Sequence, residues 1–483
     1  MSNLLFSDLE NVVAIARSPQ ADYDALPISV EAPELPSGVA TSSAAAAVRE
    51  LFAAWGLDRE HYGTEQWNPL GAFIRPGASV VLKPNWVLHI NRTGHSLGYI
   101  VTHTSVIEAV LEYVALAKPG RVIVGDAPVQ GCDFTTLLQL MGVPGMVSRM
   151  QARGLDLSIA DFRRTVLPGE ELGRTKLENQ RGMDQYILYD LKQDSLLEPL
   201  NADAEKFRVT MYNPDLLRKT HCPGRHQYLI AREVIDVDVV INLPKLKAHK
   251  KSCITGALKN LVGINGHKEY LPHHRKGGKQ TGGDCYAGGS RLKGWAEDLL
   301  DAANREQTGY HQLLLARLSY FLVRCAKRMG EDTNIEGSWY GNDTVWRTTL
   351  DLQRILRYGR TDGTMGTEPQ RYVISITDAI IGGEGEGPMM PLPVPSAFLT
   401  GGINSAATEW VNARLMGFDP QRIPLTREAF AAFKFRLAQF GPESIRVRLA
   451  TETLSADEIF PFERRAFLPP QGWQGHCEMS FPQ

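Results

Sequence analysis

Residues 239–263 read VVINLPKLKAHKKSCITGALKNLVG. The stretch opens with the β-branched run 239–241, which is typical of a strand buried on both faces of a sheet. Pro244 then ends the predicted strand, because proline has no N–H to donate to a neighbouring strand. A buried strand that leads into a polar loop and a helix is how open α/β sheets build ligand sites at the carboxyl ends of their strands. The stretch therefore predicts both a fold class and the place of a site.

The polar loop begins with three residues that alternate along the chain, Lys245, Lys247 and His249. If the backbone stays extended beyond the proline, the three side chains project from the same side. Two ammonium groups and an imidazole at a strand end indicate an anionic ligand. We expect Lys245 and Lys247 to anchor or polarise this ligand and His249 to transfer protons.

A short helix is predicted directly after these basic residues. Ser252 or Thr255 can cap its first turn, and Gly263 marks its end. The helix carries Lys259 and Asn260, which we expect to contribute to binding of the same ligand.

The segments PKLKAH and TGALKNLVG within this stretch resemble the DUF362 family, which is named for a domain of unknown function. Other segments that match the family pattern are LKPNW (82–86), GDAP (125–128), TDAIIGGEGEGP (377–388) and NSAATEWVNARLMG (404–417). In the last of these, Glu409 stands where the family pattern usually has Asp. The resemblance extends from about residue 79 to 420 and implies the fold and the site more than a reaction. Many members carry ferredoxin-like cysteine clusters or an export signal, and this sequence shows neither.

Upstream, the segments 79–83 and 121–125 read as strands with a helix between them. This alternation is typical of a parallel sheet with right-handed crossovers. We therefore predict an α/β fold, built on a mainly parallel β-sheet flanked by helices and interrupted by a largely helical insertion. The predicted parts are a lead-in packed on the core (1–75), the first part of the α/β core (76–265), a basic Gly/His-rich loop with the helical insertion (266–370), and the second part of the core with the C-terminal segment (371–483).

Polar residues also follow the two upstream strands. Lys83 and Asn85 come at the end of the first, and Asp126 at the end of the second. Adjacent strand ends of a parallel sheet converge on one crevice, so Lys83, Asp126 and Lys245 are predicted neighbours. Asp126 would orient a partner or a metal, although an Asp at this place also suits a simple turn or helix cap. Lys83 could equally form an ion pair with such an acid.

The segment from Lys245 to Lys293 holds eleven Lys and Arg residues against two acids, whereas the whole chain carries a net charge of −2. Such an excess repels itself unless an anion lies among the cations or water solvates them. His273 and Arg275 fall within its glycine-rich part, and we expect both to bind substrate. A glycine-rich loop lined with cations favours close backbone approach to phosphate or carboxylate oxygens.

A third group of candidates is acidic. Asp378, Glu384 and Glu386 follow a predicted strand at 371–377, within the glycine-rich run GGEGEGP. Carboxylates on a pliable backbone can hold a hard divalent cation such as Mg²⁺. An acidic turn that faces the basic loop is the alternative.

Composition narrows the class of protein. The 483 residues are 43% hydrophobic and 22% charged, as in an ordinary globular protein. The six cysteines form no C-x-x-C pair, which argues against an iron–sulfur cluster and for a reducing compartment. The N-terminus lacks the pattern of a signal peptide, and the apolar run 313–323 contains Arg317 and is too short to span a bilayer. We expect a cytoplasmic protein with no nucleic-acid or membrane partner, and the sequence leaves a homo-oligomer open.

Two functions fit these observations. The first is an enzyme that binds a small anionic metabolite, with proton-transfer or cofactor-dependent redox chemistry. The second is a non-catalytic accessory protein that binds a metal, a phosphorylated ligand or a redox partner. A deep pocket around the basic strand end favours the enzyme, and a shallow open face favours the accessory protein. The sequence specifies no cofactor and leaves a divalent metal open.

Overall fold

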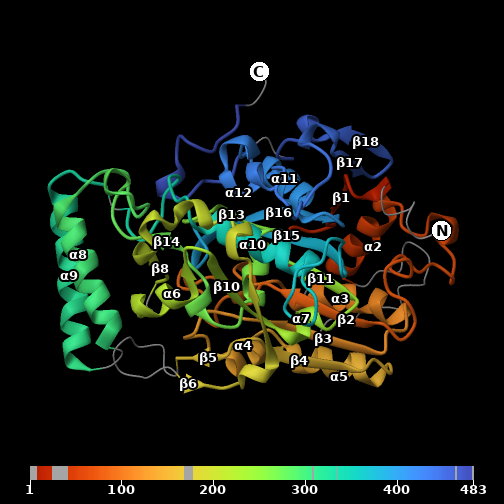
Figure 1. The fold of residues 1–483 in the computed structure, drawn as a ribbon. Coiled ribbons are helices and arrows are strands. Elements are labelled where there is room, and N and C mark those ends of the chain that lie inside the picture. The colour runs from red at the N-terminus through yellow and green to blue at the C-terminus, as the bar shows by residue number, and fades with distance from the viewer. Residues whose placement is uncertain are drawn as a thin grey trace.

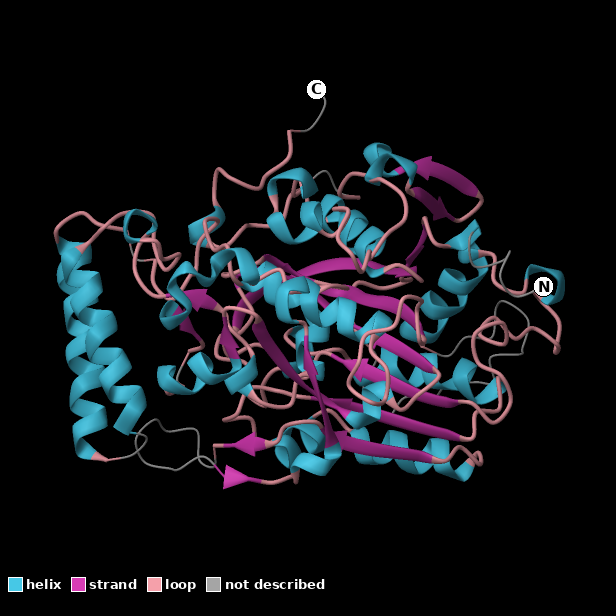
Figure 2. Ribbon diagram, in the orientation of Figure 1, coloured by secondary structure: helices cyan, strands magenta, loops and turns pink. Residues whose placement is uncertain are grey.

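The computed structural model describes residues 8–23, 42–167, 178–210, 212–306, 309–332, 334–462 and 465–480. One large sheet lies at its centre (Figures 1 and 2). Its strands are β1 (Val12–Arg17), β2 (Ser79–Pro84), β3 (Arg121–Asp126), β4 (Leu157–Asp161), β11 (Val239–Leu243), β12 (Lys245–His249), β13 (Cys253–Thr255), β15 (Tyr372–Glu386), β16 (Met390–Gly402), β17 (Arg446–Leu449) and β18 (Glu452–Ser455). The order is β18-β17-β1-β16-β15-β11-β2-β3-β4, and β12 and β13 extend the sheet beside β15.

The predicted α/β fold is confirmed, but the sheet is mixed. From β15 through β11, β2 and β3 to β4, each strand runs parallel to the next. On the other side of β15 the pairs are mostly antiparallel, because β16 returns as the second strand of a hairpin and pairs in turn with β1. The parallel half is the part that the upstream strand–helix–strand pattern predicts, and it carries the site described below.

Helices and smaller sheets cover both faces of the large sheet. The helices are α2 (Ser43–Trp55), α3 (Thr104–Leu116), α4 (Phe134–Leu140), α5 (Val143–Ala152), α6 (Pro214–Thr220), α7 (Arg232–Ile235), α8 (Arg291–Glu306), α9 (Tyr310–Arg328), α10 (Val345–Tyr358), α11 (Ser405–Leu415) and α12 (Pro424–Glu428). The small strands are β5 (Thr165–Val166), β6 (Glu178–Asn179), β7 (Tyr186–Asp190), β8 (Phe207–Arg208), β9 (His221–Cys222), β10 (Arg225–Ala231) and β14 (His274–Arg275).

The β-branched run of β11 is buried on both faces, as predicted. Val239 and Ile241 pack into a core shared with α2, α3 and α5. Val240 points to the opposite face and packs with residues of β7, β10 and α10. Successive side chains of a strand point to opposite faces, so two layers must cover a strand that is apolar throughout.

Beyond Pro244 the structure differs from the prediction in one respect. The chain stays extended and forms β12, which pairs with β15 and makes a hairpin with β13. Ser252 and Thr255 therefore cap no helix; Thr255 lies in β13 and the Ser252 hydroxyl donates to a backbone carbonyl within the hairpin. The predicted helix is reduced to the 3₁₀ helix Lys259–Ile264. Pairing with β15 gives the backbone of this segment its partners without a helix.

The strand predicted at 371–377 is more than twice as long. It is β15 (Tyr372–Glu386), and the glycine-rich run that we placed after the predicted strand is its second half. The long hairpin with β16 explains this difference, because it pairs the glycines across the full run. Pro391, Pro393 and Pro395 of β16 alternate opposite this half of β15.

Between residues 266 and 370 the longest elements are helices. α8 and α9 pack side by side and extend from one end of the molecule, at the left of Figure 1. Neither α9 nor any other helix in the described ranges combines the length and the apolar character needed to cross a membrane.

Candidate functional site

A cavity of about 770 Å³ opens at the carboxyl ends of β2 and β3, next to β12. Eight of the ten residues that the sequence predicts for catalysis and substrate binding line it: Lys83, Asn85, Asp126, Lys247, His249, Lys259, Asn260 and His273. The topology explains this gathering, because parallel neighbouring strands end at the same edge of the sheet. Lys245 and Arg275 do not line the cavity.

An ion pair forms the floor of the cavity. Lys83 Nζ lies 2.7 Å from Asp126 Oδ1, and both side chains are almost fully buried. Asn260 Oδ1 accepts hydrogen bonds from Lys83 Nζ at 2.9 Å and from Asn85 Nδ2 at 3.0 Å. Burial lowers the pKa of Lys83 and raises the pKa of Asp126, and the attraction within the pair opposes both shifts. The sequence predicted this proximity of Lys83 and Asp126.

Gly263 packs directly against this ion pair. The sequence suggested that Gly263 ends a helix, but its role in the structure is close approach, because a Cβ at this position would overlap Asp126 Oδ1 and lie 2.7 Å from Lys83 Nζ. We expect Gly263→Ala to destabilise the protein by about 1–3 kcal/mol, the usual cost of overpacking. Urea denaturation measures the loss. Gly288→Ala is the control, since an added Cβ there meets nothing within 4 Å. Equal stability of the two variants would contradict the steric argument.

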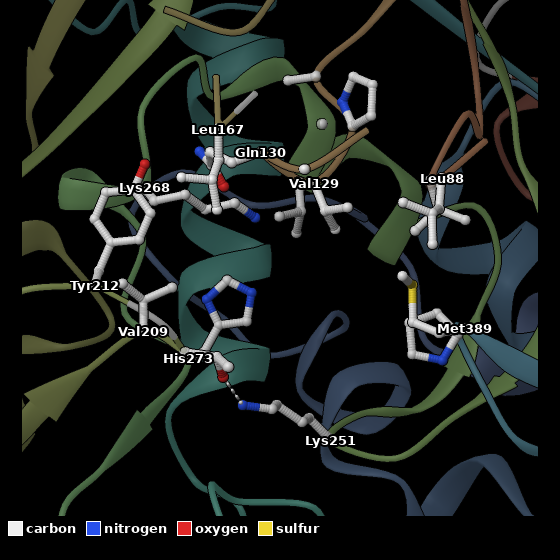
Figure 3. A pocket seen from close by; sticks show the side chains of 18 of the residues that line it. Leu88, Val129, Gln130, Leu167, Val209, Tyr212, Lys251, Lys268, His273 and Met389 are labelled. Carbon is white, nitrogen blue, oxygen red and sulfur yellow. Dashed lines mark hydrogen bonds between the residues drawn. The ribbon is translucent and has the colours of Figure 1, made fainter. Parts of the chain in front are cut away.

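Three lysines cluster in the cavity wall without an ion-pair partner. Lys251 Nζ donates a hydrogen bond to Thr210 Oγ1 at 3.1 Å, the contact drawn in Figure 3. Lys259 and Lys268 have neither a hydrogen bond nor an ion pair from their ammonium groups among the described residues. Burial, assisted by Lys268, Lys251 and Lys83, lowers the pKa of Lys259 to about 7. Burial and Lys251 lower the pKa of Lys268 to about 8.

Two histidines of the cavity are held in opposite tautomers. His249 Nδ1 accepts hydrogen bonds from the backbone N–H groups of Lys251 and Ser252, at 3.0 and 3.3 Å. His273 Nδ1 lies 2.7 Å from the carbonyl oxygen of Leu271, which can only accept, so this nitrogen carries the proton. Burial lowers the pKa of both imidazoles well below the usual value. His249 therefore offers an Nε2–H donor, and His273 offers an Nε2 acceptor.

Lys247 and Lys245 occupy different surroundings, although they lie two residues apart. The Lys247 ammonium donates to the carbonyl oxygen of Ile100 at the edge of the cavity, and burial lowers its pKa well below the usual value. Lys245 Nζ contacts the Tyr23 hydroxyl and lies 3.3 Å from Asp378 Oδ2. The register between β12 and β15 shifts between the two lysines, which separates side chains that a regular strand would align.

Arg275 also lies away from the cavity. Its guanidinium donates to the carbonyl oxygen of Gly282 at 3.1 Å and lies 3.7 Å from Asp284, so it holds the glycine-rich loop together. Substrate binding by Arg275 was predicted from the local excess of cations. The local excess of Lys and Arg therefore includes residues, such as Arg275, that are bound by other residues of the fold and are not free for a ligand.

The three acidic candidates for a metal site have separate partners. Asp378 pairs with Lys245, Glu384 with Arg465, and Glu386 with Lys250. Asp378 and Glu384 are six residues apart on extended β15, which corresponds to about 20 Å. The described part of the chain contains no group of three or more His, Cys, Asp and Glu residues placed to hold a metal ion.

Sequence reasoning missed the apolar side of the cavity and three of its lysines, Lys250, Lys251 and Lys268. Leu88 and Met389 lie across the cavity from Lys268 in Figure 3, and Val129 lies between them. These apolar residues come from three loops that are distant in sequence, so no local pattern connects them. The three lysines were within reach of prediction, because all of them contribute to the basic excess after Lys245.

Glu409 of α11 lies behind the site. Its carboxylate occupies the space that a side chain at Gly256 would need. Burial raises the pKa of Glu409 to about 7, while the backbone N–H groups of 257–259 and the side chain of Asn412 oppose the shift. None of these groups forms a hydrogen bond of regular geometry with the carboxylate.

Comparisons with known proteins extend these observations. A model of the family described as domain of unknown function DUF362 matches residues 80–181 and 193–414. A thylakoid-associated protein of Synechocystis sp. is 28% identical over 212 residues, which cover 44% of this chain and 47% of that protein. A crystal structure of a protein from Thermotoga maritima aligns with a TM-score of 0.27 and 9% identity, over 66% of this chain and 49% of that one. The chain thus spans about half the length of the thylakoid-associated protein.

Proposed function

The chain belongs to the DUF362 family, and we propose that it is an enzyme that binds a small organic anion in the cavity at the ends of β2 and β3. The anion carries a carboxylate or a phosphate group. One observation supports this proposal above all: Lys251, Lys259 and Lys268 lie in one cavity wall, and none of them has an ion-pair partner among the described residues. Like charges in a region of low dielectric repel strongly, and a bound anion relieves this repulsion.

The shape and lining of the cavity favour catalysis over simple binding. A volume of about 770 Å³ lies in the range of ligand pockets. The lysines bind the anionic end of the ligand, and the apolar side formed by Leu88, Val129 and Met389 takes its carbon skeleton. His273 accepts a proton at Nε2, and His249 donates a hydrogen bond from Nε2 to an oxygen that gains charge. This division assigns proton transfer to His273, whereas the sequence suggested His249.

Removal of one lysine tests the anion site. We expect Lys268→Met to weaken binding of inorganic phosphate by about 10- to 100-fold, because a hydrogen bond to a charged group contributes about 1.5–3 kcal/mol. Isothermal titration calorimetry measures the dissociation constant. Lys279→Met is the matched control, since Lys279 belongs to the same basic loop but is exposed and lies outside the cavity lining.

The result separates the alternatives. Equal phosphate binding by Lys268→Met and Lys279→Met would reject the anion site. Selective loss in Lys268→Met, together with an organic anion identified by mass spectrometry in the purified protein, would support it. An intact ligand that the protein never converts would favour the non-catalytic accessory protein instead.

A further inference from the structure

Lys259 differs from the other buried lysines at the cavity. Lys83 is paired with Asp126, and Lys247 donates to the carbonyl oxygen of Ile100. The side chain of Lys259 is 7% exposed and lines the cavity, and its amine has no hydrogen-bond or ion-pair partner among the described residues. A buried amine that is not engaged by the protein is available to react with a ligand.

We propose that Lys259 is a nucleophile that forms an imine with carbonyl compounds carrying a carboxylate or phosphate group. The inference rests on the proposed anion site and adds the substrate class. Lys251 and Lys268 hold the anionic group, which places the carbonyl carbon of the same ligand within reach of the Lys259 amine. A lysine in an apolar setting beside other cations is a common way to obtain such a nucleophile.

The step needs no oxidant or reductant. The neutral Lys259 amine attacks the carbonyl carbon, and a C–N bond forms as the C=O π bond breaks. The nitrogen loses one proton and the oxygen gains one, which gives a neutral carbinolamine. A neighbouring ammonium group, Lys268 or Lys251, then donates one proton to the departing hydroxyl. The C–O bond then breaks, water leaves, and a protonated imine remains. One water molecule is released for each imine formed.

The electrostatic surroundings of Lys259 support this chemistry. The amine attacks only in its neutral form, and a pKa of about 7 makes that form roughly a thousandfold more abundant at pH 7 than in a lysine with a pKa of 10.5. The charged groups that act most strongly on Lys259 are the ammonium groups of Lys268, Lys251 and Lys83, and these add to burial in lowering its pKa. The imidazoles of His249 and His273 also lie near Lys259, and burial keeps both neutral near pH 7. The carboxylates of Asp126, Glu269 and Glu336 line the same cavity, with Glu336 acting on Lys251 and Asp126 on Lys268.

A pair of matched probes tests the proposal. Pyridoxal 5′-phosphate carries an aldehyde and a phosphate on a ring, and pyridoxine 5′-phosphate is the same anion with an alcohol in place of the aldehyde. The protein is incubated with each compound and treated with sodium borohydride, which converts an imine into a stable secondary amine. Peptide mass spectrometry then locates the modification. We expect one dominant adduct on Lys259 with the aldehyde and none with the alcohol.

Three variants accompany the wild-type protein. Lys259→Arg keeps the positive charge but cannot form the imine, so it should bind pyridoxine 5′-phosphate in calorimetry and give no adduct in the cavity. Lys268→Met should bind both probes more weakly and still react at residue 259. Lys279→Met should behave as the wild type. Circular dichroism confirms that each variant is folded.

The outcomes distinguish this inference from the proposed function. Binding of pyridoxine 5′-phosphate with aldehyde adducts only on other lysines would overturn the role of Lys259 and leave the anion site standing. Failure of both probes to bind in the cavity, with adducts spread over surface lysines, would overturn both. The rate of adduct formation provides a second readout. It should rise with pH and level off above about pH 7 for Lys259, whereas an ordinary lysine continues to gain reactivity up to about pH 10.

Discussion

Lys83→Met is expected to destabilise the protein by about 3–5 kcal/mol, because it leaves the Asp126 carboxylate buried without its ion-pair partner. The two side chains are 1% and 4% exposed, so water cannot replace the lost contact. The ammonium of Lys83 also donates to Asn260 Oδ1 and to the carbonyl oxygen of Pro84. Denaturation in urea, followed by tryptophan fluorescence and circular dichroism, measures the loss of unfolding free energy.

A double variant and a surface variant make this expectation specific. Lys83→Met combined with Asp126→Asn should be more stable than Lys83→Met alone, since no unpaired charge remains buried. Lys434→Met breaks an exposed ion pair with Asp194 and should cost less than about 1 kcal/mol. A loss for Lys83→Met as small as that for Lys434→Met would show that the buried pair does not stabilise the fold.

Glu409→Gln is expected to become more stable relative to the wild type as the pH rises. The pKa of Glu409 is about 7 in the folded protein and 4.5 in an unperturbed chain. The folded state therefore binds the proton more tightly, and the wild type loses stability between about pH 4.5 and 7 as this proton is released. At about 1.4 kcal/mol for each pKa unit, the loss reaches about 3 kcal/mol above pH 7. The side chain in Glu409→Gln has no carboxyl proton to release, so this variant avoids the loss of stability.

The measurement compares the unfolding free energies of Glu409→Gln and the wild type at pH 5 and pH 8. The difference between them should grow by up to about 3 kcal/mol over this interval. Glu452→Gln, at an exposed position of β18, should differ from the wild type by nearly the same small amount at both pH values. A constant offset for Glu409→Gln would mean that the carboxyl titrates alike in the folded and unfolded states.

Local sequence patterns predicted the parallel part of the sheet and much of the site. The alternation of strand and helix identified β2, α3 and β3, and the parallel arrangement predicted that Lys83 lies beside Asp126. This inference succeeds because it needs only the direction of neighbouring strands. It requires no knowledge of loops or of side-chain packing.

The segment after Pro244 could not be predicted in the same way. Proline usually ends a strand, but here the chain pairs with β15 again on the other side of the proline. The decisive partner, the glycine-rich second half of β15, lies more than 130 residues away. This half of β15 is a strand because it pairs with β16. Its glycine and glutamate residues are themselves depleted in sheets. Both segments are extended because tertiary pairing overrides local preference.

The apolar side of the cavity shows the same limit for function. Leu88, Val129 and Met389 belong to three separate loops. Nothing in the sequence around each of them marks it as a ligand-binding residue. Basic residues cluster in the sequence itself, so composition reveals them. An apolar surface assembled from distant loops becomes visible only when the chain is folded.

The alternating prolines of β16 have a consequence for solubility. The side of β16 that faces away from Gly383 and Gly385 pairs with no strand in the described part of the chain at Pro391, Pro393 and Pro395. Residues two apart direct their backbone groups to the same side, so this open edge lacks N–H donors at three successive positions. Leu392, which lies between these prolines, is 47% exposed. An exposed apolar side chain at an edge that could donate hydrogen bonds would favour pairing between molecules. Missing N–H donors along an edge disfavour pairing with a strand of another molecule, which is a common way for sheet proteins to limit edge-to-edge association.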